Sequence, residues 1–214
     1  MLLAEDVLIL LVKRASGNVP RRGGTQAALA AAVLMELAGA GRLGVDRDGA
    51  GRLHAFVDDH TPFGDPLLDS ALAAVHSVDG ELVLDAVHAV VPGLYIWLLN
   101  RLTERGMLTF RLGGWWVADR TRREHLRHWL AGVLHGPSAP DWGSGALISV
   151  LHMLGATSLV VGGSVAGARA TAIANGDWPA NEVTSAIAED CADIVLSWTS
   201  QGGGPTATAP TWRG

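Results

Sequence analysis

The sequence predicts a mainly α-helical protein with two short β-hairpins, in a single domain that spans residues 1–200. Three observations support this class. Apolar residues recur at helical spacing along most of the chain. Breaks rich in glycine and proline separate these segments. Two stretches, 42–58 and 107–118, instead place β-forming residues around a tight turn that contains glycine. With 214 residues, of which 49% are hydrophobic, the chain can bury a sizeable core.

Two helices and a hairpin are predicted near the start of the chain. Leucine and valine side chains share one face of residues 2–14 and again of residues 25–38, and the hairpin over 42–58 follows. A third helix is predicted to begin at the Asp65-Pro66 pair. The aspartate can accept hydrogen bonds from free amides of the first turn, and proline fits the first helical position because no N–H is needed there.

The second half of the chain is also predicted to be helical. Pro92–Arg105 carries a leucine-rich face, and Gly106 follows its end. Thr121–Glu124 has the spacing of a capping box, which predicts a helix from there to about Leu134. Further helices are expected at 146–155, near 164–175 and at 179–198, and a disordered tail rich in glycine, proline and threonine at 201–214.

The second hairpin carries the clearest signal for function. Strands are predicted at Met107–Leu112 and Trp115–Ala118, joined by a Gly113–Gly114 turn. Such a hairpin could contact an anionic membrane surface or a second copy of the chain, or its rings could pack into the protein's own core. The apolar side chains concerned are Phe110, Leu112, Trp115, Trp116 and Val117.

Arginines surround this hairpin in an otherwise acidic chain. Residues 101–128 contain seven arginines and three acidic residues, a local net charge of +4, whereas the whole chain has a net charge of −5. The overall charge argues against a general nucleic-acid binder. The local excess predicts one oriented contact with an anionic partner, or else an ordinary solvated helix face. The arginines are at positions 101, 105, 111, 120, 122, 123 and 127.

The sequence also predicts that the protein is cytoplasmic and that it can bind at the cytoplasmic face of a membrane. Cys191 is the single cysteine, so no intramolecular disulfide can form and a reducing compartment is expected. Glu5 and Asp6 interrupt the apolar N-terminal run, which argues against a secretory signal. No stretch approaches eighteen uninterrupted apolar residues, so no membrane-spanning segment is expected.

No catalytic residue, metal site or cofactor is predicted. The glycine-rich segment 159–167 matches neither a P-loop nor a dinucleotide fingerprint. His125 and His128 are spaced to share a metal ion, but no further ligands accompany them. An acidic cluster resembles a metal or acid–base site and consists of Asp58, Asp59, Asp65 and Asp69. Asp65 is already expected to cap a helix.

Four segments in matching order resemble the Golgi phosphoprotein 3 family, which includes yeast vacuolar protein sorting 74 and many bacterial relatives. They are LLAEDVLILLV (2–12), ELAGAGRL (36–43), TPFGDPLLDSAL (61–72) and LLNRLTERGMLT (98–109). The resemblance covers roughly residues 2–195 and implies a helical bundle wrapped by amphipathic helices, with one protruding apolar hairpin. Fifteen arginines against one lysine indicate a GC-rich coding genome, so we expect a bacterial member.

The resemblance implies a peripheral membrane adaptor that is not an enzyme. Eukaryotic members bind phosphatidylinositol 4-phosphate and retain Golgi glycosyltransferases. Their lipid pocket uses a tryptophan and arginines, and these positions fall here at Arg21, Ala30, Pro92 and Tyr95. Because none of the four matches, that pocket is not carried over to this chain.

We therefore expect a different anion site that binds phosphoinositide-like headgroups through guanidinium groups, which suit phosphate. The residues concerned are Arg21, Arg22, Arg101, Arg105 and Arg111. The alternative function is a cytosolic protein-binding scaffold in which the hairpin forms a homo-oligomer interface without lipid binding.

Overall fold

A computed structural model describes residues 1–12, 23–111, 114–162 and 166–200. These residues form nine helices and two separate two-stranded antiparallel sheets. The predicted mainly α-helical class with two short hairpins is therefore confirmed. The predicted tail at 201–214 lies outside the described residues.

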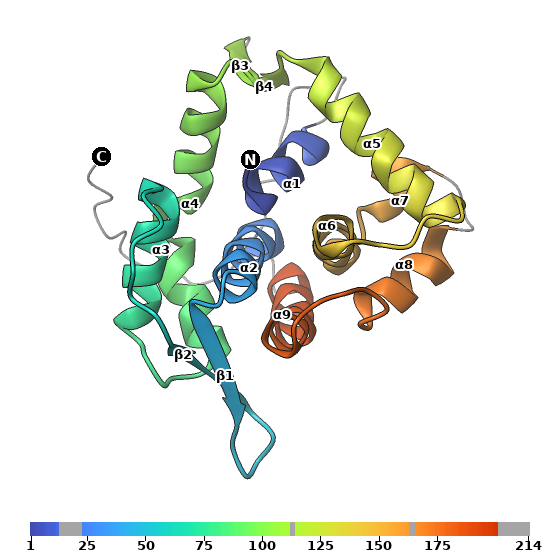
Figure 1. The fold of residues 1–214 in the computed structure, drawn as a ribbon. Helices are drawn as coiled ribbons and strands as arrows, with labels where there is room; N and C mark the ends of the chain where they lie inside the picture. The colour runs from blue at the N-terminus through green and yellow to red at the C-terminus, as the bar shows by residue number, and fades with distance from the viewer. Residues whose placement is uncertain (13–22, 112–113, 163–165, 201–214) are drawn as a thin grey trace.

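A helix that is buried on nearly all sides lies at the centre of the fold. Helix α2 (Gly23–Gly39) packs against α1 (Leu3–Leu11), α4 (Val83–Glu104), α6 (Trp142–Met153) and α9 (Glu182–Ser200), which surround it in Figure 1. Fourteen of its seventeen residues are buried. Its run of alanines explains how this is possible, because small side chains let neighbouring helices approach closely on every face.

The elements between α2 and α4 follow the prediction closely. Strands β1 (Leu43–Arg47) and β2 (Leu53–Val57) form the first hairpin, and α3 (Pro66–His76) follows. The predicted cap is confirmed, because Oδ1 of Asp65 accepts a hydrogen bond from the backbone N–H of Leu67 at 3.0 Å.

Helix α4 consists of two helical parts: the second corresponds to the predicted Pro92–Arg105 helix, whereas the first, which begins at Val83, is not predicted by the sequence. The two parts meet at a break in which Pro92 is extended and Gly93 has a φ of 78°. Proline cannot donate the helical hydrogen bond, and glycine tolerates the left-handed conformation that restarts the helix. Among the described residues, α4 is the one helix long and apolar enough to cross a membrane, but it packs here against α2, α3 and α9.

The last third of the fold contains α5 (Arg120–His135), α6, α7 (Thr157–Val161), α8 (Ala166–Ala174) and α9. The predicted capping box is wrong, because Asp119, not Thr121, caps α5: its Oδ1 accepts a hydrogen bond from the Thr121 N–H at 2.8 Å. The predicted start of α6 is also late. Asp141 caps it through the Ser144 N–H at 2.7 Å, so the helix begins within the expected loop.

The second hairpin is formed by β3 (Leu108–Arg111) and β4 (Gly114–Val117). Gly114, which was predicted to lie in the turn, is instead the first residue of β4 and pairs with Arg111. This register places Phe110 directly opposite Trp115, with ring centroids 5.0 Å apart. The predicted register would have paired Phe110 with Val117, and a direct aromatic pair stabilises a two-stranded ribbon more effectively.

Two glycines in neighbouring helices give a matched test of the packing. A Cβ at Gly145 would lie 2.5 Å from ring atoms of the buried Trp178, whereas a Cβ at Gly132 would meet nothing within 4 Å. We expect Gly145→Ala to lower the free energy of unfolding by about 1–3 kcal/mol through overpacking. Gly132→Ala should raise it by about 0.5–1 kcal/mol, because alanine favours the helix. Urea unfolding measures both, and equal effects would contradict this packing.

Candidate functional site

A buried carboxylate lies among the arginines that the sequence singled out. Glu5, in the first turn of α1, is 0% exposed. Its Oε1 accepts hydrogen bonds from Nε of Arg101 at 2.8 Å and from Nη1 of Arg105 at 3.0 Å. Its Oε2 accepts one from the Leu2 N–H at 2.8 Å. A buried charge is tolerated only when it is paired and hydrogen-bonded in this way.

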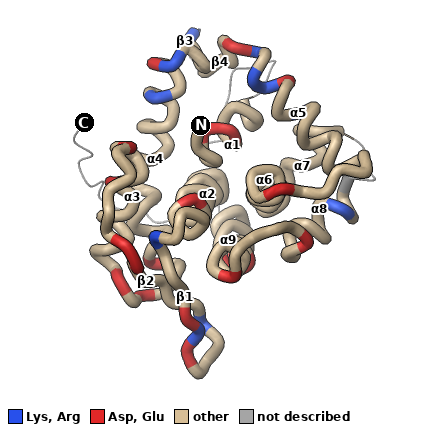
Figure 2. Tube along the Cα trace, viewed as in Figure 1, with Lys and Arg blue, Asp and Glu red and all other residues tan. Residues whose placement is uncertain are grey.

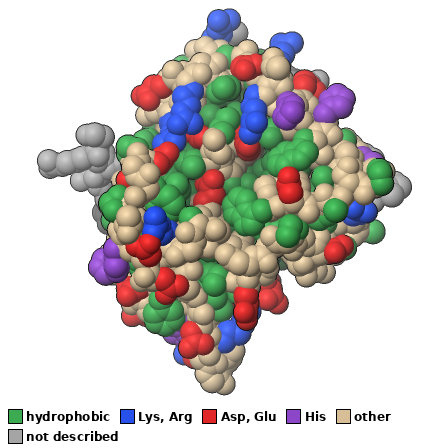
Figure 3. Space-filling view, viewed as in Figure 1, with side chains coloured by type: hydrophobic (Ala, Val, Ile, Leu, Met, Phe, Trp, Pro, Cys, Tyr) green, Lys and Arg blue, Asp and Glu red, His purple; other side chains and the backbone are tan. Residues whose placement is uncertain are grey.

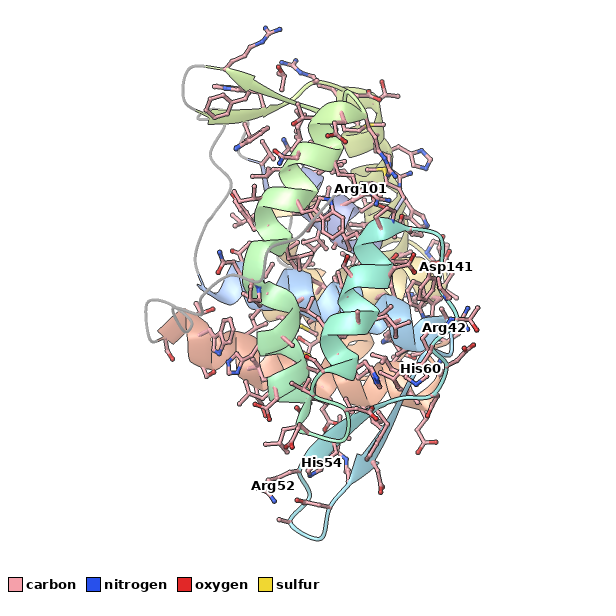
Figure 4. The ribbon with its side chains drawn as sticks, turned by 90° about the vertical axis from the view of Figure 1, so that its left-hand side faces the viewer. Arg42, Arg52, His54, His60, Arg101 and Asp141 are labelled. Atoms are coloured by element: carbon pink, nitrogen blue, oxygen red, sulfur yellow. The ribbon has the colours of Figure 1, made fainter. Side chains whose placement is uncertain are left out.

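Arg101 extends the same network to a third helix. It lies on α4 near the start of α3 (Figure 4), and its Nη1 donates to Oδ1 of Asp65 at 2.7 Å. Its Nη2 forms an ion pair with the same carboxylate. The hydrogen bonds from Arg101 lower the pKa of Asp65, and those to Asp65 raise the pKa of Arg101. One guanidinium therefore joins α1, α3 and α4.

A second arginine group attaches α5 to α1. Nη2 of Arg122 lies 2.6 Å from Oδ2 of Asp6, and Arg123 donates to the Leu10 carbonyl oxygen at 3.3 Å. Burial nevertheless raises the pKa of Asp6, because desolvation outweighs the attraction of Arg122. Both arginines are engaged within their own subunit.

Glu36 is a second buried acid beside this network. It lies on α2, and its Oε1 accepts a hydrogen bond from the Leu3 N–H at 2.9 Å. Its buried Oε2 has no hydrogen-bond partner among the described residues. Burial, aided by the negative charge of Glu5, raises its pKa from 4.5 to about 7. Sequence reasoning missed Glu5, Asp6 and Glu36 as a cluster, although acids inside strongly apolar helices are a signal of internal pairing.

The second hairpin is partly attached to the body and partly exposed. Leu108 is 1% exposed and anchors its base, whereas Phe110 is 57% exposed. Trp115 and Trp116 are half-buried, so neither indole is sealed in the interior. The indole N–H of Trp116 donates to the Arg111 carbonyl oxygen at 3.0 Å, which stiffens the ribbon next to its turn.

The seven arginines divide into two groups. The internal group, described above, consists of Arg101, Arg105, Arg122 and Arg123. The second group consists of Arg111, Arg120 and Arg127, which form no ion pair with any described residue. Of these three, Arg111 and Arg120 are exposed. The local charge of the sequence is therefore only partly available to an external partner.

Basic residues are most frequent at the end of the molecule that carries the second hairpin, although acidic residues also occur there and arginines also occur on the first hairpin (Figure 2). Figure 2 shows arginines around β3, β4 and the start of α5, and acidic residues around β1, β2 and α9. The space-filling view in Figure 3 shows the same trend on its visible face. We call the end that carries Phe110, Arg111, Trp116 and Arg120 the hairpin pole.

The remaining predicted site residues have defined places. Arg21, Arg22 and Leu112 lie outside the described residues. Val117 is half-buried at the base of β4. Binding of an anion by the candidate arginines stays a prediction. Arg101 and Arg105 also have a structural role, because both donate hydrogen bonds to Glu5.

The aspartates of the predicted acidic cluster do not form a common site, because they contact different partners. Asp59 forms an ion pair with Arg42, Asp65 with Arg101, and Asp69 accepts a hydrogen bond from the Phe63 N–H at 2.6 Å. Within the described residues, no three histidine, cysteine or acidic side chains are grouped to hold a metal ion.

The comparisons with known proteins agree with the fold. A family model described as Golgi phosphoprotein 3 (GPP34) matches residues 3–189. No curated protein matches the chain. The resemblance drawn from the four sequence segments is therefore confirmed at the level of the family.

Removing the buried charge of Glu5 tests the internal network. We expect Glu5→Gln to lower the free energy of unfolding by about 1.5–3 kcal/mol, because it weakens the charged hydrogen bonds to Arg101, which keeps Asp65, and to the partly exposed Arg105. The control is Glu189→Gln, whose partner Arg47 is 3.2 Å away at the surface, and which should cost less than about 1 kcal/mol. Chemical denaturation measures both, and similar small losses would contradict the proposed importance of Glu5.

The raised pKa of Glu36, about 7, predicts a pH-dependent stability. Between the unfolded value of 4.5 and the folded value of about 7, the folded state holds more protons, so its stability falls as pH rises through this window. The loss attributable to Glu36 is roughly 3 kcal/mol. Glu36→Gln should lack it, so the stability difference between variant and wild type should shift in favour of the variant from about pH 5 to about pH 8. A difference that does not change with pH would overturn this assignment.

Proposed function

Because the chain belongs to the Golgi phosphoprotein 3 family, we propose that it is a non-enzymatic, adaptor-like peripheral protein that docks onto anionic membrane surfaces through its hairpin pole. In this proposal the hairpin pole faces the lipid headgroups at the cytoplasmic face of a membrane. The rest of the surface is left available to client proteins.

Exposure of Phe110 is the observation that carries the proposal. Its ring is 57% exposed although it forms a direct pair with Trp115. Arg111, next to it in β3, is exposed and has no ion pair with a described residue. An exposed aromatic ring beside a cation suits the boundary between apolar and charged layers of a bilayer.

The magnitudes favour weak, reversible attachment. Burial of Phe110 offers about 1.5–3 kcal/mol, and each arginine near an anionic surface adds about 1 kcal/mol. With Arg111 and Arg120 as the outward charges, the sum is modest once the cost of association is included. Attachment of one copy should therefore depend strongly on salt, and several copies on one membrane would bind more firmly.

Recognition of the headgroup rests on charge in this proposal. Two positions where the family's pocket carries arginines hold Ala30, which is 0% exposed, and Tyr95, which is 7% exposed. A third holds Pro92, at the break in α4. We therefore propose binding to anionic headgroups in general, phosphoinositides among them, without a shaped pocket at these positions.

A second candidate function uses the same surface. The apolar face of the hairpin, with Phe110 and Trp115 side by side, could also pack against a second copy and form a scaffold without lipid contact. The two functions are distinguished by vesicle binding and by molecular mass in solution.

Sedimentation with phosphatidylserine-containing vesicles tests the proposal. Wild-type protein should sediment with the vesicles at about 0.05 M salt and be released at about 0.5 M salt. Phe110→Ser combined with Arg111→Gln should abolish sedimentation. The matched control is Phe56→Ser with Arg52→Gln, on the first hairpin at the opposite end of the molecule (Figure 4), and it should sediment like wild type.

Light scattering, which measures molecular mass in solution, distinguishes the scaffold function from the lipid-binding function. A loss of oligomer mass in the Phe110/Arg111 variant, without vesicle binding by wild-type protein, would replace the lipid proposal with the scaffold. Equal sedimentation of all three proteins would show that the hairpin pole is not the docking surface.

A further inference from the structure

A cavity of about 750 Å³ lies away from the hairpin pole. It is bounded by the C-terminal ends of α6 and α8, by one face of α9 and by Arg47 at the end of β1. Its volume is within the range of sites that bind small molecules. The vesicle-binding proposal does not use it.

Carboxylates line the α9 side of this cavity. Glu182, Glu189 and Asp193 lie on the same face of the helix, because intervals of seven and four residues are close to whole turns. Their positions are roughly 10 Å and 6 Å apart along the helix axis. The cavity therefore presents a row of negative charges at regular intervals.

These charges are only partly balanced. Nη2 of Arg47 lies 3.2 Å from Oε2 of Glu189 at the rim. Glu182 and Asp193 have no ion pair with a described residue, and α9 contains no basic side chain. The neighbouring Asp190 responds to this environment: burial raises its pKa, the positive charge of Arg47 opposes the increase, and repulsion from Asp193 and Glu189 adds to it.

The helix ends add to the negative potential. The cavity is lined by His152 and Met153 at the end of α6, and by Ala174 and Asn175 at the end of α8. The C-terminal end of a helix carries a partial negative charge, so two such ends favour a cation between them. The opposing N-terminal end of α9 is capped by Asn181, whose Oδ1 accepts a hydrogen bond from the Thr184 N–H at 2.7 Å.

The cavity also offers apolar surface between the charges. Ala186 lies between Glu182 and Glu189 on this face, Ala188 and Ala192 line the cavity beside it, and Leu196, which is 60% exposed, extends the apolar surface to the next turn of α9. The edge of Trp178 forms another part of the wall. A ligand that fits would carry several positive charges separated by short apolar links.

We propose that this cavity binds an aliphatic polyamine, with its ammonium groups on Glu182, Glu189 and Asp193 and its methylene links along the alanines and Leu196. Ser185 and the His152 ring are additional polar groups in the wall. The ligand lies along α9 and leaves the hairpin pole free, so membrane docking and polyamine binding use separate surfaces.

Calorimetric titration with spermidine tests the proposal. We expect saturable binding to wild-type protein and a loss of affinity of about tenfold or more in the Glu182→Gln/Asp193→Asn variant. Both positions are exposed, so the variant should keep its melting temperature. The control Glu104→Gln, at the exposed end of α4 next to β3, should bind spermidine like wild type. Amide NMR shifts at Asn175 and Gly176 should report the site.

Three other results would contradict the proposed polyamine site. An equal loss in Glu104→Gln would indicate diffuse charge attraction and no defined site. Binding of the uncharged 1,8-octanediol with comparable affinity would show that the cavity selects alkyl chains. Binding of tetralysine without any binding of spermidine would replace the small ligand with a basic peptide.

Discussion

The charge of Glu5 imposes the main constraint on this fold. A carboxylate that is 0% exposed must be paired, and its partners come from a helix about a hundred residues further along the chain, at distances of 2.8–3.1 Å. Because Arg101 also holds Asp65, the cap of α3, the same contact fixes where three helices meet. Arg122 and Asp6 repeat the arrangement on the other side of α1 and attach α5, which follows the second hairpin directly.

This network also explains how the hairpin pole is presented. Helix α4 ends immediately before β3, and α5 begins immediately after β4. Both helices are attached to α1 through ion pairs, so the hairpin between them has a firm base although each strand has only four residues. The arrangement has a cost for function, since four arginines bind groups of the protein itself, although the side chains of Arg105 and Arg122 are 44% and 32% exposed. The outward surface is left with a few cations and one exposed ring, which suits reversible contact more than tight binding.

The separation of charge gives the two proposed surfaces different partners. Arginines prevail at the hairpin pole (Figure 2), whereas carboxylates prevail in the cavity along α9. An anionic membrane would attract one end and repel the other, so the protein would be oriented before any specific contact forms. The buried helix α2 lies between these surfaces and separates them by a rigid core, which allows each to be occupied independently.

Local chemistry in the sequence determined much of the fold. The Asp65-Pro66 start of α3, the alanine-rich α2 and the two hairpins follow from capping, helical periodicity and turn residues, all of which act over a few positions. Two predictions differ from the structure: Asp119 outcompeted Thr121 as a cap, and the helical part of α4 that precedes the break at Pro92 was not predicted. For the candidate site, the sequence predicted a role for the hairpin and its arginines. Tertiary structure alone decided that Arg101 and Arg105 pair with Glu5 while Arg111 and Arg120 form no ion pair with a described residue, because the pairing of a buried charge depends on residues that are distant in the chain.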